Sequence, residues 1–299
     1  MLKGALPEKY EYVLMCRMSK IQKDLMMAFL DTAINDPDAL GTVKGRISTL
    51  TIFAVCCKVW NHPDIVYDIV RKGLVVDDLD IDIPTKNKAK NNRKKKVNNG
   101  STSVDTNADI EVKPMNFFND IPNPCDLFDT PLRMKEKNER VLDFSWADPK
   151  MSDYEPGLLE NSFKMVLLFE IIAETLALGD RLLVFSQSLL TLDLIERFLQ
   201  SREVPKKRTK WCKNENYYRL DGSTSTQERE RYINLFNNTS NAHLFLISTR
   251  AGSLGINLIG ANRIVIFDAS WNPCHDAQAA CRIYRYGQVL HLIFCPYLK

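Results

Sequence analysis

Residues 182–199 read LLVFSQSLLTLDLIERFL, and this stretch decides the fold class. The run 182–185 is apolar at every position, which is typical of a strand buried on both faces. The polar residues 186–188 follow it. From 190 to 199 the apolar side chains recur at helical spacing, so that one face carries Leu192, Ile195, Phe198 and Leu199. The stretch therefore predicts a buried strand, a short polar turn and a helix.

The same alternation continues along the chain. Apolar runs at 217–220, 244–247 and 263–267 predict three more strands, and segments of helical period at 226–236 and 275–286 predict helices. Continuously apolar strands separated by helices indicate a parallel sheet that is covered on both faces. We therefore expect an α/β fold from residue 141 to residue 288.

A polar turn rich in small residues follows each of the four strands. In an open parallel sheet these turns meet at one edge, where ligands bind. The glycines of the turns, Gly222, Gly252 and Gly255, allow backbone N–H groups to approach a ligand, and Arg250 adds a positive charge. Trp271 either stacks on a sugar or base or packs into the core. This chemistry suits a polyphosphate backbone.

The last predicted helix carries Gln278, Arg282 and Arg285 at spacings of four and three, which places all three on one face. Two guanidinium groups that point the same way suit an anion of high charge, such as the γ-phosphate of a nucleotide in its transition state. The alternative is a solvated basic face.

The first seventy residues are predicted to be ordered and mainly helical, with a strand at 11–18 and helices at 19–33 and 47–60. Ser19 is the expected N-cap of the first helix, and Asn61-His62-Pro63 is expected to end the second. Residues 71–140 are predicted to be a mostly disordered insertion, because an acidic cluster is followed by seven basic residues between 86 and 96. We favour a nuclear localisation signal or a phosphate-binding arm over a solvated linker for this basic run. A second basic stretch, 202–213, is interpreted as a solvated insertion.

Composition excludes several classes of protein. The chain is 45% hydrophobic, which rules out disorder throughout, and its 40 basic and 37 acidic residues give a net charge of only +3. No apolar run reaches the length of a membrane span, and the start does not resemble a signal peptide. The eight cysteines form no C-x-x-C pair, so we expect reduced thiols and no metal ligands.

Five blocks of the sequence resemble the Swi/Snf-type ATPases of helicase superfamily two, and in the order of that family. Asp180 to Ser188 is similar to motif IV, 218–224 to the block that follows it, and 248–258 to motif V. Residues 267–273 are similar to the next block and 278–288 to motif VI. The match at 53–64, 186–196 and 273–288 is to the ATRX-like branch.

The resemblance implies that a smaller, mainly helical inter-lobe region (1–70) precedes a second, RecA-like lobe (141–288). By that match Arg282 and Arg285 would be catalytic arginine fingers, and Gln278, Gly255 and Asn257 would bind ATP. The family's DNA-contacting positions correspond to Gln187, Gly222, Ser223, Thr224, Thr249, Arg250 and Trp271. It further implies ATP and Mg²⁺ held mainly by a first lobe. The implied partners are double-stranded DNA or nucleosomes, that first lobe, and nuclear receptors or other transcription regulators, with a nuclear location and no membrane.

Three features of the sequence depart from the family. The phosphate loop G-x-x-x-x-G-K-S/T and the acidic Asp-Glu pair are both missing, Phe163 replaces a glycine, and 289–299 is a divergent or truncated tail. We therefore expect the chain alone to hydrolyse no ATP. The leading hypothesis is the second motor lobe of a DNA translocase that remodels chromatin. The alternative is a non-catalytic DNA- or partner-binding fragment without a nucleotide-binding lobe, whereas the form of 268–273 disfavours an RNA helicase.

Overall fold

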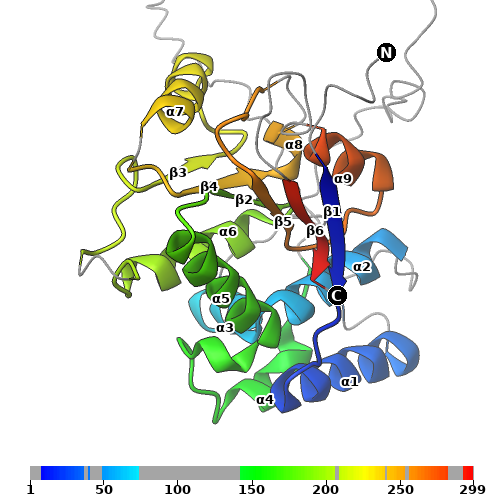
Figure 1. The fold of residues 1–299 in the computed structure, drawn as a ribbon. Coiled ribbons are helices and arrows are strands. Elements are labelled where there is room, and N and C mark those ends of the chain that lie inside the picture. The colour runs from blue at the N-terminus through cyan, green and yellow to red at the C-terminus, as the bar shows by residue number, and fades with distance from the viewer. Residues whose placement is uncertain are drawn as a thin grey trace, which may run out of the picture. The chain divides into compact units, whose positions relative to one another are not determined.

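The computed structural model describes residues 8–36, 40, 49–73, 142–205, 209–239, 241–252, 256–281 and 292–298. At its centre lie six parallel strands in the order β1-β6-β5-β2-β4-β3 (Figure 1). Four of the strands, at the left and centre of the sheet in Figure 1, are β2 (Leu182–Ser186), β3 (Tyr217–Leu220), β4 (Leu244–Ser248) and β5 (Arg263–Ile266). The other two are β1 (Lys9–Leu14) and β6 (Leu292–Leu298). The predicted α/β class with a parallel sheet is confirmed.

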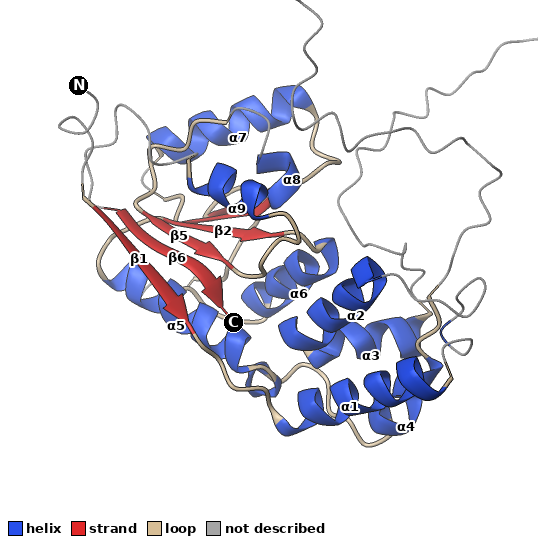
Figure 2. Ribbon diagram, turned by 90° about the vertical axis from the view of Figure 1, so that its right-hand side faces the viewer, coloured by secondary structure: helices blue, strands red, loops and turns tan. Residues whose placement is uncertain are grey.

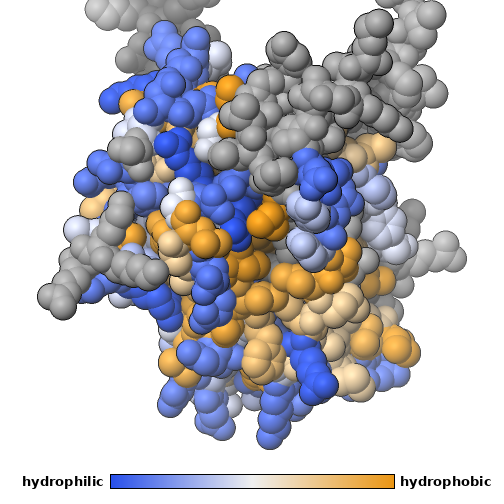
Figure 3. Space-filling view, viewed as in Figure 1, coloured by the Kyte–Doolittle hydropathy of each residue, from blue (hydrophilic) through white to orange (hydrophobic). Residues whose placement is uncertain are grey.

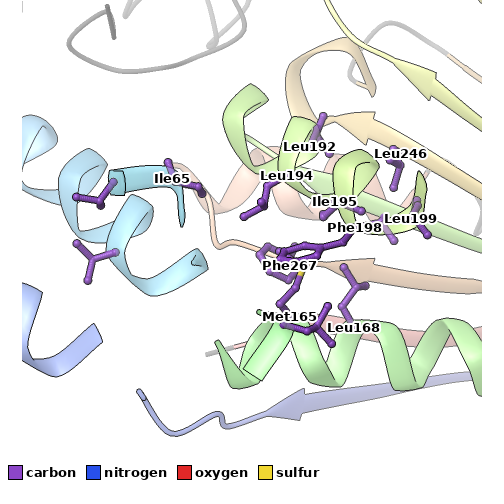
Figure 4. Close-up of a cluster of buried hydrophobic side chains, with 14 of the residues drawn as sticks. Ile65, Met165, Leu168, Leu192, Leu194, Ile195, Phe198, Leu199, Leu246 and Phe267 are labelled. Atoms are coloured by element: carbon purple, nitrogen blue, oxygen red, sulfur yellow. The ribbon is translucent and has the colours of Figure 1, made fainter. Parts of the chain in front are cut away.

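In β2, β3, β4 and β5, alternate side chains enter two separate cores. Leu182 and Val184 belong to the larger cluster of buried residues, and Leu183 and Phe185 belong to the other. Helices α5 (Phe163–Ala177) and α6 (Leu189–Gln200) pack into the larger cluster. Figure 4 shows how their leucines and Phe198 surround Phe267. On the opposite face α7 (Thr226–Asn238) and α8 (Thr249–Gly252) contribute Phe236 and Ala251.

The N-terminal helices share the larger core with the sheet. They are α1 (Lys20–Asn35), α2 (Thr49–Asn61) and α3 (Pro63–Lys72), and Leu25, Phe29 and Val59 from them are fully or almost fully buried. In Figure 2 they lie with the short α4 (Asp148–Met151) at the lower right, to the right of α5 and α6, while α7 and α8 lie above the strands. Two single turns of 3-10 helix, Ser145–Ala147 and Leu159–Asn161, complete this side.

Local signals explain where these helices begin. Ser19 caps α1 as predicted: its side chain accepts a hydrogen bond from the backbone of Gln22, whose side chain accepts one from the backbone of Ser19. The expected end of α2 at Asn61 is also confirmed. Sequence reasoning missed α3, which begins immediately with Pro63 at its first position. Proline stops the preceding helix but is well suited to start the next one, because its φ angle is already helical.

Strand β1 lies at the edge of the sheet, next to β6. The sequence predicts a strand at 11–18 and treats 289–299 as a tail; in the structure β1 pairs in parallel with β6, which in turn pairs with β5. Much of β1 is exposed, including Tyr12 and Val13. Figure 3 shows apolar residues gathered on the face where Figure 1 places β1, whereas hydrophilic residues prevail over α7. Thus the N-terminal segment contributes both helices and an edge strand.

Some predictions fall outside the described residues. The insertion 71–140 does so from residue 74 onward, and of the basic stretch 202–213 residues 206–208 are not described. The helix predicted at 275–286 is described as α9 (Pro273–Ala280). The division of the chain at residues 70, 140 and 288 stays a prediction.

His62 joins α2 to α3 and is completely buried. Its Nδ1 accepts a hydrogen bond of 3.1 Å from the backbone N–H of Asp64, and its Nε2 lies 3.1 Å from the carbonyl oxygen of Leu158. These two contacts fit a neutral ring that donates from Nε2. Burial lowers the pKa of His62 to about 4, although Asp64 opposes the shift.

We therefore predict that the protein loses stability between pH 6.5 and pH 4. In that range the unfolded chain takes up a proton at His62 that the folded chain does not bind, at a cost of up to about 3 kcal/mol. Urea unfolding of the wild type and of His62→Gln at pH 7 and pH 5 checks this. The variant should show the smaller change in unfolding free energy, and an equal change in both proteins would contradict the assignment.

Candidate functional site

The loops after β2, β3, β4 and β5 lie at one edge of the sheet, because all four strands run parallel. The helix that follows β2 packs on one face, whereas the helices that follow β3 and β4 pack on the other. The carboxyl end of β2 is therefore a topological switch point, where open α/β sheets bind their ligands.

Asp268, directly after β5, is the centre of a buried hydrogen-bond network at this point. Its Oδ2 accepts hydrogen bonds from Asn61 Nδ2 (2.9 Å) and Ser186 Oγ (2.7 Å). Its Oδ1 accepts one from the backbone N–H of Gln187 (2.8 Å), and the side chain of Gln187 donates to the carbonyl oxygen of Ala269 (2.6 Å). The loops after β2 and β5 are thus joined to each other and to the end of α2.

Both polar atoms of the Asn61 side chain, Nδ2 and Oδ1, take part in this network. Besides Asp268, its Nδ2 donates to Thr191 Oγ1 (2.9 Å), and its Oδ1 accepts a hydrogen bond from Lys164 Nζ (2.9 Å). Lys164 is buried, with its Nζ 4.8 Å from the centre of the Phe267 ring. Burial lowers the pKa of the Lys164 amine, and the nearby Asp268 opposes that shift. Adjacent Phe163, the departure from the family pattern, is 49% exposed.

The loop after β3 is held by Asp221. Its Oδ1 accepts hydrogen bonds from the backbone N–H and the hydroxyl of Ser223, and its own N–H donates to Thr224 Oγ1 (3.1 Å). Arg219 Nε donates to the other carboxylate oxygen (2.9 Å). Burial favours a higher pKa for Asp221, but the hydrogen bond from Ser223 and the charge of Arg219 outweigh it and lower the pKa. Ser223 is exposed and Gly222 half-buried.

The short helix α8 follows β4 directly and contains Thr249, Arg250 and Gly252. Arg250 is exposed, while Thr249 is 6% exposed and its hydroxyl has no hydrogen-bond partner in the described part of the chain. An unsatisfied buried hydroxyl is rare and suits an absent partner such as a phosphate oxygen. Gly252 has a packing role rather than the expected ligand-facing one, because a β-carbon there would lie 2.8 Å from the ring of Phe185.

Three further predicted site residues lie on the loop after β5, on α9 and on the segment before β5. Trp271 is 55% exposed, and its ring packs edge-on against Phe53 of α2 at 5.4 Å, so that it both contacts its neighbour and faces solvent. Gln278 is half-buried on α9 and Asn257 is exposed. Gly255, Arg282 and Arg285 lie outside the described residues, so their predicted roles stay predictions.

Sequence reasoning missed the place of Asn61 and Lys164 in the buried hydrogen-bond network. A signal for Lys164 exists, because it is a lone basic residue at the start of a strongly apolar helix. Asn61 gives no such signal, since asparagine is common at a helix end. In the parts of the chain that the structure describes, no three His, Cys, Asp or Glu residues gather as metal ligands. Within the same parts, none of the helices has the length and apolarity to cross a bilayer.

We predict that Asn61→Ala destabilises the protein by about 3 kcal/mol or more, because it leaves the buried Lys164 and Asp268 without their shared partner. Thr191→Val is the matched control: it preserves side-chain shape, removes a single contact of Asn61, and should cost about 1 kcal/mol. Urea unfolding of both variants measures the difference. Equal losses would show that the network contributes no more than one ordinary hydrogen bond.

Comparison with known proteins agrees with this geometry. Residues 164–287 match the family model described as the helicase conserved C-terminal domain. The chain is 46% identical over 302 aligned residues to Helicase ARIP4 of Xenopus tropicalis, a match that covers 96% of this chain and 20% of that protein. It is 51% identical over 156 residues to the human transcriptional regulator ATRX, covering 48% of this chain and 6% of ATRX. The chain thus spans about a fifth of the length of its ARIP4 relatives.

Two solved structures show the same fold. One is the C-terminal part of the Fun30 ATPase domain, with a TM-score of 0.55 and 21% identity, covering 98% of this chain and 85% of that one. The other is the Sulfolobus solfataricus SWI2/SNF2 ATPase core in complex with double-stranded DNA, with a TM-score of 0.53 and 20% identity, covering 98% and 41%. The chain therefore carries a helicase conserved C-terminal domain folded as a RecA-like lobe, and over 96% of its length it is similar to Helicase ARIP4.

Proposed function

We propose that this chain is the second motor lobe of a nuclear, ATP-dependent translocase that moves along double-stranded DNA and remodels chromatin. The observation that carries the proposal is the convergence of four polar loops at one edge of a parallel sheet, at its topological switch point. In this proposal the segments after β2, β3, β4 and β5 follow the DNA backbone, and the helix predicted from the sequence at 275–286 faces ATP on a first lobe.

The DNA-facing role rests on donors that reach phosphates rather than base edges. They are the hydroxyls of Thr249 and Thr224, the backbone amide of Gly222 and the charge of Arg250, while Trp271 offers an exposed ring. The hydroxyl of Ser223 would exchange its hydrogen bond to Asp221 for one to a phosphate, and the amide of Gln187 would do so with its bond to Ala269. The unpartnered hydroxyl of Thr249 is the strongest single fit. The solved relative with bound double-stranded DNA supports the choice of duplex.

The nucleotide-facing role rests on Gln278, Asn257, Gly255, Arg282 and Arg285. Amide and guanidinium groups fit phosphate oxygens, whereas the described residues offer no acidic cluster for Mg²⁺, so the metal and most of the nucleotide belong to the first lobe. When bound, ATP supplies the phosphoanhydride bond whose hydrolysis drives movement. Arg282 and Arg285 would then stabilise negative charge at the γ-phosphate from across the cleft.

The names of the relatives support a role in transcription and a nuclear location, since ATRX is named a transcriptional regulator. Partners in this proposal are DNA or nucleosomes, the first lobe, and nuclear receptors or other transcription regulators.

The proposed role of Arg282 and Arg285 as arginine fingers leads to a prediction for a two-lobed enzyme, made by joining this chain to a matching first lobe. Arg285→Ala should lower kcat roughly 10³-fold or more, with little change in DNA affinity, and Arg285→Lys should rescue poorly because an ammonium lacks the planar fork of donors. Thr249→Val should instead reduce the DNA-stimulated increase in rate. ATPase assays with and without DNA, beside DNA titrations, measure both. Loss of DNA binding with intact hydrolysis in Arg285→Ala would place that helix on the DNA.

The chain by itself should bind duplex DNA weakly, with little base preference and with an affinity that falls as salt rises, because its contacts are to phosphates. Fluorescence anisotropy with two unrelated duplexes between 50 and 200 mM salt (roughly the range over which counterion release is measured) tests this. An affinity that does not change with salt, or a strong preference for one duplex, would contradict the proposed contacts.

A further inference from the structure

Helix α7 is hydrogen-bonded to the segment between β4 and β5 through the side chain of Asn237. Its Nδ2 donates to the carbonyl oxygen of Asn257 (3.0 Å), and its Oδ1 accepts a hydrogen bond from the backbone N–H of Gly260 (3.0 Å). One amide thus satisfies two backbone groups, and it fixes the turn that follows Asn257 from both sides.

The same helix also reaches the beginning of that segment. Arg229 Nη1 donates to the carbonyl oxygen of Ala251 in α8 (3.2 Å). Arg229 and Asn237 are eight residues apart on one rigid helix, about 12 Å along its axis. Helix α7 therefore holds the segment at α8, next to Thr249 and Arg250, and again at Asn257.

Packing at the second contact leaves no free space. A β-carbon on Gly260 would lie 2.9 Å from the Cα of Asn237 and 3.3 Å from Nη1 of Arg181. Arg181 Nη1 in turn donates to the carbonyl oxygen of Phe236, so the end of α7 is also fastened to the start of β2. Because backbone meets backbone here, the turn cannot move toward α7 without displacing the helix.

From this geometry we propose that Asn237 is a positioning residue, which holds the segment with Asn257 at one end and α8 at the other in the arrangement that ATP and DNA require. The inference rests on the proposed function and deepens it. In that function Asn257 faces the nucleotide and α8 faces the DNA, and α7 keeps the distance between them fixed. Asn237 touches neither ligand in this proposal and acts only through the backbone of Asn257 and Gly260.

Two variants break the contact from opposite sides, and a neighbour serves as the control. Asn237→Ala removes the amide, and Gly260→Ala inserts a methyl group against the backbone of α7. Asn238→Ala changes the adjacent residue, which is exposed. Hydrogen exchange of the full chain should rise at least tenfold in 256–261 for the first two variants and less than twofold in β4 for all three.

The second measurement uses the two-lobed enzyme with Arg285→Ala in parallel. Asn237→Ala should raise KM for ATP at least fivefold, with a smaller effect on kcat, whereas Asn238→Ala should match the wild type. Suppose that Arg285→Ala abolishes turnover, as the proposed function requires. Then faster hydrogen exchange throughout β4 in Asn237→Ala, or an unchanged KM for ATP in that variant, would overturn the positioning role alone. Full turnover by Arg285→Ala would instead overturn the proposed function itself.

Discussion

The side-chain amide of Asn61 is the contact on which the arrangement of the lobe depends. It stands between the amine of Lys164 and the carboxylate of Asp268, and it also donates to Thr191. A buried amine and a buried carboxylate are each costly unless every polar atom finds a partner. One amide that both donates and accepts meets this need for four segments of the chain, the ends of α2 and β5 and the starts of α5 and α6.

This network determines more than stability. Asp268 uses one oxygen to bind Asn61 and the other to bind the backbone at Gln187, so the position of α2 is coupled to the loop after β2. The ring of Trp271, three residues after Asp268, rests on Phe53 of the same helix. The N-terminal helices are therefore part of the support of the loop edge, because they share its hydrogen bonds as well as its core.

Much of the fold could be predicted from the sequence, because its signals are local. The continuous apolar runs predict four buried strands, each followed by a polar turn. The capping box at Ser19 marks the start of α1. The pairing of β1 with β6 could not be predicted, since it joins residues from opposite ends of the sequence. Helix α3 was missed because Pro63 signals a stop as strongly as a start.

The candidate site, too, could be predicted only where its signals are local in the sequence. The loops could be placed at one edge, but hydrogen bonds such as that between Asn61 and Asp268 span 207 residues of sequence and leave no local pattern. Gly252 shows the converse: a glycine in a motif invites a ligand-binding interpretation, and only the neighbouring ring of Phe185 reveals its packing role. The kind of ligand that the loops suit could be inferred from residue type, whereas the side chains that hold the loops in place could not.

The pairing of β1 with β6 also has a consequence for the order in which the protein is made. A ribosome produces residues 9–14 before residues 292–298, so β1 has no partner while the chain between the two strands is made. Such a non-local pairing forms slowly, and an unpaired apolar strand is prone to associate with other chains. Lys9 and Glu11 lie on this strand and form an ion pair with each other, and charged side chains on an edge strand disfavour such association.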